Sequence, residues 1–240
     1  CKTAQVVVVG GVRRSALISL SNLSDDLLRS AKSGDWWTHY NYRSYANNSA
    51  VYKDRPEMGI FMKEWQALYK SRSGERGMFS RAAAQKQAAQ SGRRETEHDF
   101  GTNPCCEIIL RPYQFCNLTE VVVKKDDTRE SLLNKVRLAT ILGTYQATLT
   151  DFKYLRKVWQ RTTEEERLLG VSLTGIMDNP LTHEIGEPLE TLLSDLRAKA
   201  VETNKEWAER FGIPQSTAIT CVKPSGTVSQ LVDAASGIHA

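Results

Sequence analysis

The sequence lacks any apolar run approaching the roughly eighteen residues that a membrane-spanning helix needs, so we expect no membrane partner. It has only five cysteines in 240 residues, too few for the disulfide framework of a small secreted domain. No two cysteines form a Cys-x-x-Cys pair and the four histidines are scattered, so we expect no metal site. A secretory signal pattern is also missing. These absences favour a cytoplasmic protein with reduced thiols.

A strong bias in charge is missing as well. The formal net charge is only +4, and charged residues make up 25% of the chain, as in ordinary globular proteins. The basic pairs Arg93-Arg94 and Lys124-Lys125 are short, so we interpret them as solvated loops and expect no direct contact with nucleic acid. With 40% hydrophobic residues the chain can bury a substantial core.

Hydrophobic spacing predicts the main secondary structure. Helices are expected over residues 58–71, 79–90, 127–150 and 188–211, with further helical stretches over 151–160, 164–169 and 230–235. Strands are expected over residues 15–21, 50–52, 119–123, 170–175 and 217–222. Ser24 is the expected N-cap of a short helix. Strands that alternate with helices indicate an α/β fold with parallel strands, and the pattern leaves open whether the sheet is open or closed into a barrel.

Residues that carry chemistry gather in one stretch, Asn103-Pro104-Cys105-Cys106-Glu107, which is followed by Cys116. In an extended backbone Asn103, Cys105 and Glu107 would point to the same side, because side chains alternate with a period of two. Pro104 cannot donate to a sheet ladder, so we expect a loop or the tip of a strand. The alternative is that the two cysteines are small buried side chains without a chemical role.

A second candidate site follows the strand expected at residues 217–222. It is a turn of small residues, Ser225-Gly226-Thr227-Val228-Ser229, that leads into a helical stretch. Free backbone N–H groups and the helix dipole at such a turn favour an anion, and three hydroxyl groups add donors. Lys223 precedes the turn, so the segment is not a Walker A loop. The alternative is a well-capped helix without a ligand.

Five blocks, in this order, carry a resemblance to a known family. The first two and the last two are Gly10-Gly11-Val12-Arg13-Arg14-Ser15-Ala16, Ala46-Asn47-Asn48-Ser49-Ala50, Gly170-Val171-Ser172-Leu173-Thr174-Gly175 and Pro224-Ser225-Gly226-Thr227-Val228-Ser229. The central block is Asn-Pro-Cys-x-Glu with a further cysteine eleven positions after the first. Together they resemble the adenosylcobalamin-dependent class II ribonucleotide reductases. The resemblance implies that residues 1–240 are part of a single catalytic domain truncated at both ends: a partial ten-stranded α/β barrel with a central finger loop.

The resemblance also implies a reaction, the reduction of ribonucleotides to 2′-deoxyribonucleotides for DNA synthesis. Cys105 would carry a thiyl radical, Glu107 would act as the base at the 3′-hydroxyl, and Asn103 would hold the ribose hydroxyls. Cys116 would be half of the reducing dithiol. The remaining implied sites are a substrate phosphate site at Ser225, Gly226, Thr227, Val228 and Ser229, and a specificity loop at Gly10, Gly11, Val12, Arg13, Arg14 and Ser15.

Cofactor and partners follow from the same resemblance. Adenosylcobalamin would supply the radical. The expected partners are a ribonucleotide substrate, dNTP or ATP effectors, a thioredoxin-like protein or another dithiol reductant, and a second copy in a homodimer. The thiol partner of Cys116 is expected outside this chain. Cys106 departs from the family pattern, which commonly has glycine or serine at that position.

Two other classes of protein remain open from the sequence. One is the large subunit of a class I ribonucleotide reductase, which shares the thiol, amide and carboxylate but receives its radical from a partner subunit. The other is a catalytically inactive paralogue that only binds nucleotides. The intact set of Asn103, Cys105, Glu107 and Cys116 argues against the second.

Overall fold

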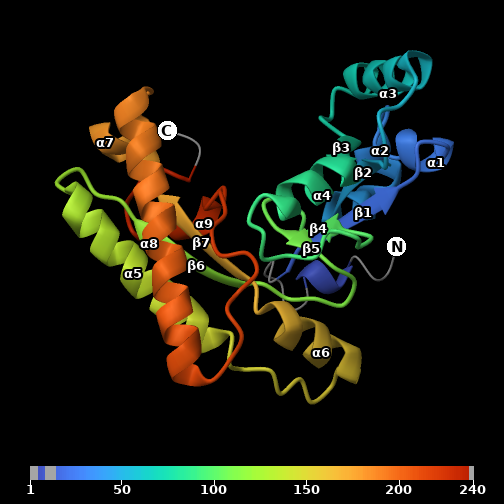
Figure 1. Ribbon diagram of the computed structural model, residues 1–240. Coiled ribbons are helices and arrows are strands. Elements are labelled where there is room, and N and C mark those ends of the chain that lie inside the picture. Colours follow the sequence, from blue (N-terminus) through green and yellow to red (C-terminus); the bar gives the residue numbers. More distant parts are fainter. Residues whose placement is uncertain (1–4, 9–14, 238–240) are drawn as a thin grey trace. The chain divides into compact units, whose positions relative to one another are not determined.

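The computed structural model describes residues 5–8 and 15–237, and the chain divides into two compact units (Figure 1). The first unit comprises residues 1–87 and 96–109, and the second comprises residues 88–95 and 110–240. Across the described part of the chain, no helix combines the length and the apolar character that crossing a membrane requires. The interpretation of residues 1–240 as part of one catalytic domain stays a prediction.

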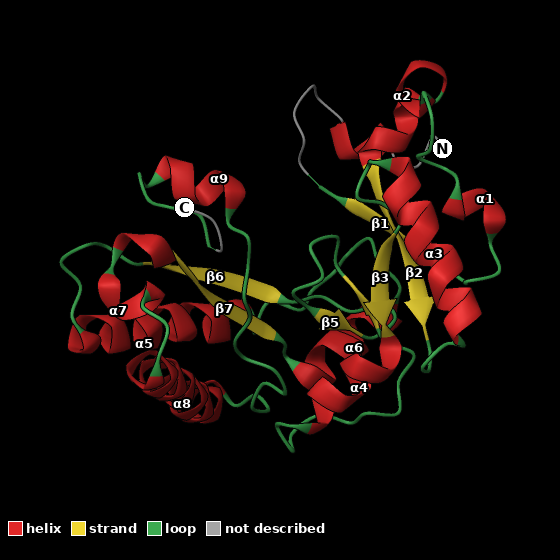
Figure 2. Ribbon diagram, turned by 90° about the horizontal axis from the view of Figure 1, so that it is seen from above, coloured by secondary structure: helices red, strands yellow, loops and turns green. Residues whose placement is uncertain are grey.

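A three-stranded parallel sheet organises the first unit, in the order β1-β2-β3. Its strands are β1 (Leu17–Ser21), β2 (Ala46–Tyr52) and β3 (Gly77–Ser80). Its helices are α1 (Asp26–Arg29), α2 (Trp36–His39), a 3-10 helix (Asn41–Tyr45), α3 (Met58–Ser71) and the start of α4 (Arg81–Ala89). Figure 2 shows α3 beside the strands that it connects, β2 and β3. Parallel strands joined by helices confirm the α/β class predicted from the sequence.

Two local predictions in the first unit need correction. The N-cap of α1 is Asp25 and not Ser24, because the Asp25 carboxylate accepts a hydrogen bond from the Leu28 backbone N–H at 2.9 Å. The strand expected at residues 50–52 begins four residues earlier, at Ala46. Buried Asn48 lies within this strand and donates its side-chain N–H to the Leu28 carbonyl at 2.7 Å.

A buried ion cluster ties α3 to the sheet. The Glu64 carboxylate accepts from Arg76 Nε at 3.0 Å and from Arg76 Nη2 at 2.8 Å, and it also pairs with Arg29. Arg76 donates in addition to Ser21 Oγ at the end of β1, at 2.8 Å. Burial acts to raise the pKa of Glu64, but the hydrogen bonds from Arg76 and Arg29 outweigh it and hold the pKa below its ordinary value. Glu64 is therefore a charged carboxylate that stabilises the fold of this unit.

The second unit is built on the parallel pair β6 (Asn117–Val122) and β7 (Leu169–Thr174). The segment expected as a strand over residues 217–222 runs alongside β7. Leu169 N donates to Ala218 O and Val171 N donates to Ile219 O, each at 2.9 Å. Within this segment only Thr220 forms a bridge, to Val171, so the expectation of a full strand is wrong. A single bridge still fixes where the small-residue turn begins.

Two long helices, α5 (Arg129–Gln146) and α8 (Glu187–Phe211), lie side by side against this pair of strands (Figure 1). Their apolar faces close one hydrophobic core with the inward residues of the strands, among them Val121, Val136, Val171, Leu192 and Leu196. Alternation along β6 turns Leu118 and Glu120 toward the other face of the strand pair. The second unit also contains α6 (Lys157–Glu166), a 3-10 helix (Ile176–Asp178), α7 (Pro180–His183) and α9 (Gly226–Leu231).

Two glycines with positive φ offer a matched test of close packing. Gly175 after β7 has φ +76°, and a Cβ added there would lie 2.4 Å from the Val123 carbonyl oxygen. Gly212 after α8 has φ +66°, and a Cβ there would meet nothing within 4 Å. We expect Gly212→Ala to destabilise the protein by about 1–2 kcal/mol from backbone strain. Gly175→Ala should lower the free energy of unfolding by about 1–3 kcal/mol more than Gly212→Ala, because the added methyl group overpacks the site.

Urea unfolding of the two variants measures this difference directly. Equal losses of stability would mean that the Val123 carbonyl moves aside without cost, and that the end of β7 is not closely packed.

Candidate active site

The Asn-Pro-Cys-Cys-Glu stretch forms the loop of a short hairpin. The two-residue strands β4 (Gly101–Thr102) and β5 (Ile109–Leu110) pair on either side of it. Cys106 N donates to Asn103 O at 2.9 Å and closes a turn with Pro104 at its second position, where proline is favoured. The prediction of a loop is confirmed. Strand alternation does not arrange these side chains, because Cys106 adopts φ +63° and breaks the extended backbone.

The Asn103 side chain closes the same loop from within. Its Oδ1 accepts from Ile108 N at 3.1 Å and from Thr102 Oγ1 at 3.5 Å. The carbonyl end of this amide is therefore used to shape the loop, and its NH2 end is the part suited to donate to a ligand.

Both thiols of the loop, Cys105 and Cys106, are exposed. The alternative that they are two small buried side chains is therefore wrong. Desolvation by the folded loop raises the pKa of Cys106, the charges of Glu107 and Cys105 raise it further, and a hydrogen bond with Thr102 partly opposes the rise. Cys106 is thus held as a neutral thiol, which is a poor nucleophile.

Cys116 lies in the second unit, half-buried, directly before β6. The next residue, Asn117, donates its backbone N–H to Leu168 O at 2.9 Å and its side-chain N–H to the same oxygen at 3.2 Å. Cys105, in contrast, belongs to the first unit.

The residues before Cys116 are held by α6. The helical stretches expected at residues 151–160 and 164–169 are one helix, which begins at Lys157 and ends at Glu166, where Arg167 turns to a left-handed φ of 47°. Buried Glu166 of this helix forms an ion pair with Arg94, and both contact the Gln114 side chain. No role was predicted for Gln114 or Glu166, and the interpretation of Arg93-Arg94 as a solvated pair is wrong for Arg94, which is buried against Glu166.

The small-residue turn is the start of a helix. Helix α9 begins at Gly226, four residues earlier than expected, so the prediction of a helix over residues 230–235 is wrong. Ser225 is buried with φ +54°, and its Oγ has no hydrogen-bond partner. Buried Ser229 donates its hydroxyl to Gly226 O at 3.0 Å, while Gly226, Thr227 and Val228 are exposed. A buried hydroxyl without a partner and a free helix start together suit an anionic ligand.

Contacts from distant residues hold this turn in place. Lys124 Nζ donates to the carbonyls of Val232 at 2.6 Å and Asp233 at 2.9 Å, at the end of α9. Ala235 N donates to Asp178 Oδ2 at 2.8 Å, and Gly175 N donates to Ala235 O at 2.7 Å. Lys124, which was interpreted as part of a solvated pair, and Asp178 are thus supporting residues, because only the fold brings them to α9.

The predicted specificity loop lies mostly outside the described residues. Gly10, Gly11, Val12, Arg13 and Arg14 are not described, and Ser15 is an exposed residue two positions before β1. The role of this loop stays a prediction.

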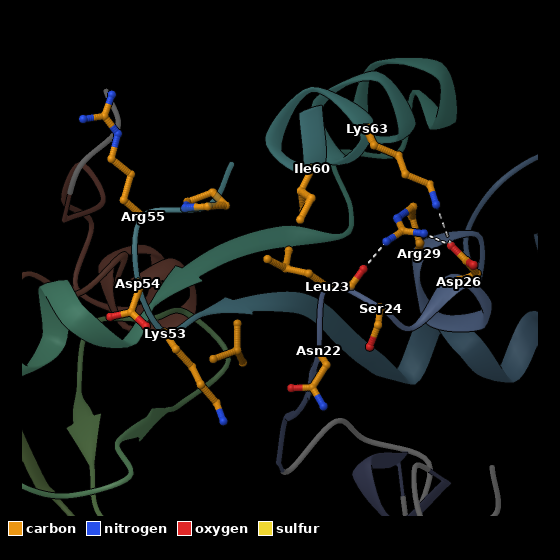
Figure 3. Close-up of a pocket in the computed structure, with 12 residues that line it drawn as sticks. Asn22, Leu23, Ser24, Asp26, Arg29, Lys53, Asp54, Arg55, Ile60 and Lys63 are labelled. Atoms are coloured by element: carbon orange, nitrogen blue, oxygen red, sulfur yellow. Dashed lines mark hydrogen bonds and ion pairs between the residues drawn. The ribbon is translucent and has the colours of Figure 1, made fainter. Parts of the chain in front are cut away.

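A separate cavity of about 700 Å³ opens in the first unit, beside the carboxyl ends of β1 and β2 and the start of α3 (Figure 3). Arg29 and Lys63 in its wall both pair with Asp26. Figure 3 shows Lys53 and Arg55 pointing in different directions, so they do not converge on one anion. None of the predicted site residues that the structure describes line this cavity.

Two solved structures share the fold of this chain. The crystal structure of a B12-dependent class II ribonucleotide reductase matches 97% of this chain and 35% of its own, with a TM-score of 0.74 and 22% identity. The alpha subunit of the class Id ribonucleotide reductase of Actinobacillus ureae matches 96% of this chain and 50% of its own, with a TM-score of 0.66 and 15% identity. The chain therefore has the fold of part of a ribonucleotide reductase catalytic subunit, which confirms the predicted fold class.

The curated sequences similar to this chain include adenosylcobalamin-dependent ribonucleoside-triphosphate reductases. The adenosylcobalamin-dependent ribonucleoside-triphosphate reductase of Lacticaseibacillus paracasei is 27% identical over 265 aligned residues, and that of Levilactobacillus brevis is 29% identical over 265. In both comparisons 98% of this chain is covered. No protein-family model matches the chain. The resemblance drawn from the five sequence blocks is thus confirmed, and the chain spans about a third of the length of the curated relatives it matches.

Proposed function

We propose that this chain is part of the catalytic subunit of a cytoplasmic, adenosylcobalamin-dependent ribonucleotide reductase that makes deoxyribonucleotides for DNA synthesis. The observation that carries the proposal is an exposed Cys105 in a hairpin loop between Asn103 and Glu107, in a chain that its reductase relatives match over 98% of its length. Because those relatives are ribonucleoside-triphosphate reductases, a ribonucleoside triphosphate is the first substrate to test.

Cys105 would be the radical carrier. When bound, adenosylcobalamin supplies a radical that takes up one hydrogen atom. The exposed thiol of Cys105, which is the cysteine of the Asn-Pro-Cys-x-Glu block, would fit such an exchange. The resulting thiyl would remove the hydrogen atom from C3′ of the ribose and return it at the end of the cycle. A hydrogen atom moves without net charge, so this step depends on placement and not on a lowered thiol pKa.

Proton transfer and reduction would fall to the other residues. The Glu107 carboxylate would accept the proton of the 3′-hydroxyl, and the 2′-hydroxyl would take up a proton from the reducing dithiol and leave as water. The NH2 group of Asn103 would donate to the ribose, since its carbonyl oxygen already accepts from Ile108 N. Cys116 and a second thiol would give up two electrons and two protons and become a disulfide.

The turn at Ser225–Ser229 would hold the phosphate groups. Its support is the buried Ser225 hydroxyl without a partner and the N–H groups at the start of α9. Further partners that we propose are dNTP or ATP effectors at the loop of residues 10–15, a thioredoxin-like or other dithiol reductant, and a second copy in a homodimer.

The test is ribonucleotide reduction by the complete polypeptide that contains this segment, with dithiothreitol as reductant and with or without adenosylcobalamin. We expect product only when the cofactor is present. Reduction that proceeds without adenosylcobalamin and requires a partner subunit would assign the protein to class I. Nucleotide binding without reduction under any of these conditions would instead favour the inactive paralogue.

A further inference from the structure

We infer that Gln114 is a positioning residue that sets the location of the Cys116 thiol, through a buried bridge between Arg94 and Glu166. The inference rests on the redox role proposed for Cys116. The inference concerns the position of the thiol group. Its evidence is four hydrogen bonds of one buried side chain, two aromatic contacts, and the hydrogen bonds that hold the residue after the cysteine.

The Gln114 side chain is 5% exposed and makes hydrogen bonds at both ends. Its Nε2 donates to Glu166 Oε2 at 2.5 Å and to Thr162 O at 3.4 Å. Its Oε1 accepts from Arg111 N at 2.9 Å and from Arg94 Nη2 at 3.3 Å. A side chain with this many partners has one allowed orientation, so it holds its own backbone two residues before Cys116.

As long as residue 166 is a carboxylate, the bridge needs an amide at position 114. Arg94 is a donor and the Glu166 carboxylate is an acceptor, and they pair with each other at 2.9 Å. A residue between them must accept from the first and donate to the second, which a glutamine does and a neutral-pH carboxylate does not. An apolar side chain of similar size would leave the Glu166 carboxylate and the Arg111 N–H short of a partner in a buried site.

The residues on both sides of Gln114 are fixed to the same helix. Thr162 Oγ1 donates to Tyr113 O, and the Tyr113 ring meets Trp159 edge-on with centroids 5.6 Å apart. Phe115 stacks on Trp159 at 4.8 Å. Contacts of this kind restrain the backbone directly before Cys116, while the Asn117 hydrogen bonds to Leu168 restrain it directly after. Cys116 therefore sits between two anchored residues.

The test compares the reactivity of two half-buried thiols of the same unit, Cys116 and Cys221, in the complete polypeptide. The probe is iodoacetamide, and mass spectrometry gives a separate alkylation rate for each cysteine. The variants are Gln114→Leu, the milder Gln114→Asn, and the exchange Gln114→Glu with Glu166→Gln. The matched control is Gln160→Leu on α6, whose amide donates only to Glu164 Oε1, at 3.0 Å.

We expect Gln114→Leu to raise the alkylation rate of Cys116 by about tenfold or more, the equivalent of one lost hydrogen bond to a charged group. The rate of Cys221 should not change. Gln114→Asn should give a smaller rise, Gln160→Leu none, and the exchange should return the rate to within about twofold of the original, because it keeps one amide and one carboxylate beside Arg94.

A parallel rise at Cys116 and Cys221 would overturn the inference, because general loosening of the unit exposes both thiols. An unchanged Cys116 rate in both Gln114→Leu and Gln114→Asn would overturn it as well. Turnover with dithiothreitol provides the second measurement, in which Gln114→Leu should lower kcat and leave KM for the nucleotide unchanged. If the unmodified protein reduces no nucleotide, the proposed function fails, and the alkylation rates still decide whether Gln114 positions Cys116.

Discussion

Replacement of Cys105 by serine is expected to abolish ribonucleotide reduction, with a loss in kcat/KM of at least about a thousandfold, or roughly 4 kcal/mol of transition-state stabilisation. The reason is chemical, since a serine O–H bond is too strong to give up its hydrogen atom where a thiol S–H bond does so. The exposed hairpin loop accepts serine without a change of volume that would disturb packing. The measurement is steady-state reduction of a ribonucleoside triphosphate with dithiothreitol and adenosylcobalamin.

The neighbouring thiol supplies the matched control. Cys106→Ser makes the same chemical change one residue away, in a side chain that is also exposed. We expect it to keep activity within about tenfold of the original, an effect of up to about 1.4 kcal/mol from small shifts in loop geometry. If instead Cys106→Ser abolishes the reaction and Cys105→Ser does not, Cys106 is the radical carrier and the roles assigned to the two thiols are reversed.

Removal of the Glu64 carboxylate is expected to cause the largest loss of stability. Glu64→Ala leaves the guanidinium groups of buried Arg76 and partly buried Arg29 without their shared carboxylate. Breaking a buried ion pair from one side destabilises a protein by about 3–5 kcal/mol, because the remaining charge stays in a poorly solvated site. Urea unfolding followed by a probe in the first unit measures the change in the free energy of unfolding.

The control for Glu64 is an ion pair on the surface. Glu206 pairs with Arg210 on α8 at 2.7 Å, with both side chains exposed, so Glu206→Ala should lose no more than about 0.5 kcal/mol. A similar loss in the two variants would show that the Glu64 cluster is no stronger than a solvated pair.

The pH dependence of stability gives a second measure of the Glu64 cluster. The folded-state pKa of Glu64 lies below its ordinary value of 4.5, so its contribution is complete above that value and is lost as pH falls through the folded-state pKa. Glu64→Gln cannot titrate and should therefore weaken the fall in stability on acidification. An acid profile unchanged by this substitution would mean that Glu64 has no shifted pKa in the folded protein.

Local sequence patterns correctly predicted the elements that are stabilised mainly by residues close together in the chain. The helix expected over residues 58–71 is α3 without change, and the helix expected over 188–211 begins one residue earlier, at Glu187. Both have regular apolar spacing, and Gly212 in a left-handed conformation ends the second. Asn-Pro-Cys-Cys-Glu was predicted as a loop because Pro104 is excluded from the interior of a sheet, and that reason holds in the structure.

The predictions that failed depend on residues far away in the chain. The helix expected over residues 230–235 ends at Leu231, because Lys124 and Asp178 bind the residues that follow it, and neither contact is visible from the local sequence. The segment at residues 217–222 has strand-forming residues but forms a single bridge. The number of hydrogen bonds that it makes depends on its position beside β7, which the local sequence does not specify. Short elements form few contacts of their own, so tertiary contacts determine their limits.

The sequence by itself determined the α/β class, the long helices and the order of the five blocks that relate this chain to ribonucleotide reductases. Each of these depends on residue types and spacing within a short window. Only the tertiary structure decided that Cys105 and Cys106 are exposed on a turn, that Glu64 joins two arginines, and that Gln114 bridges Arg94 and Glu166. The partners in that bridge are 20 and 52 residues from Gln114 in the chain, and burial and hydrogen-bond satisfaction exist only after folding has brought them together.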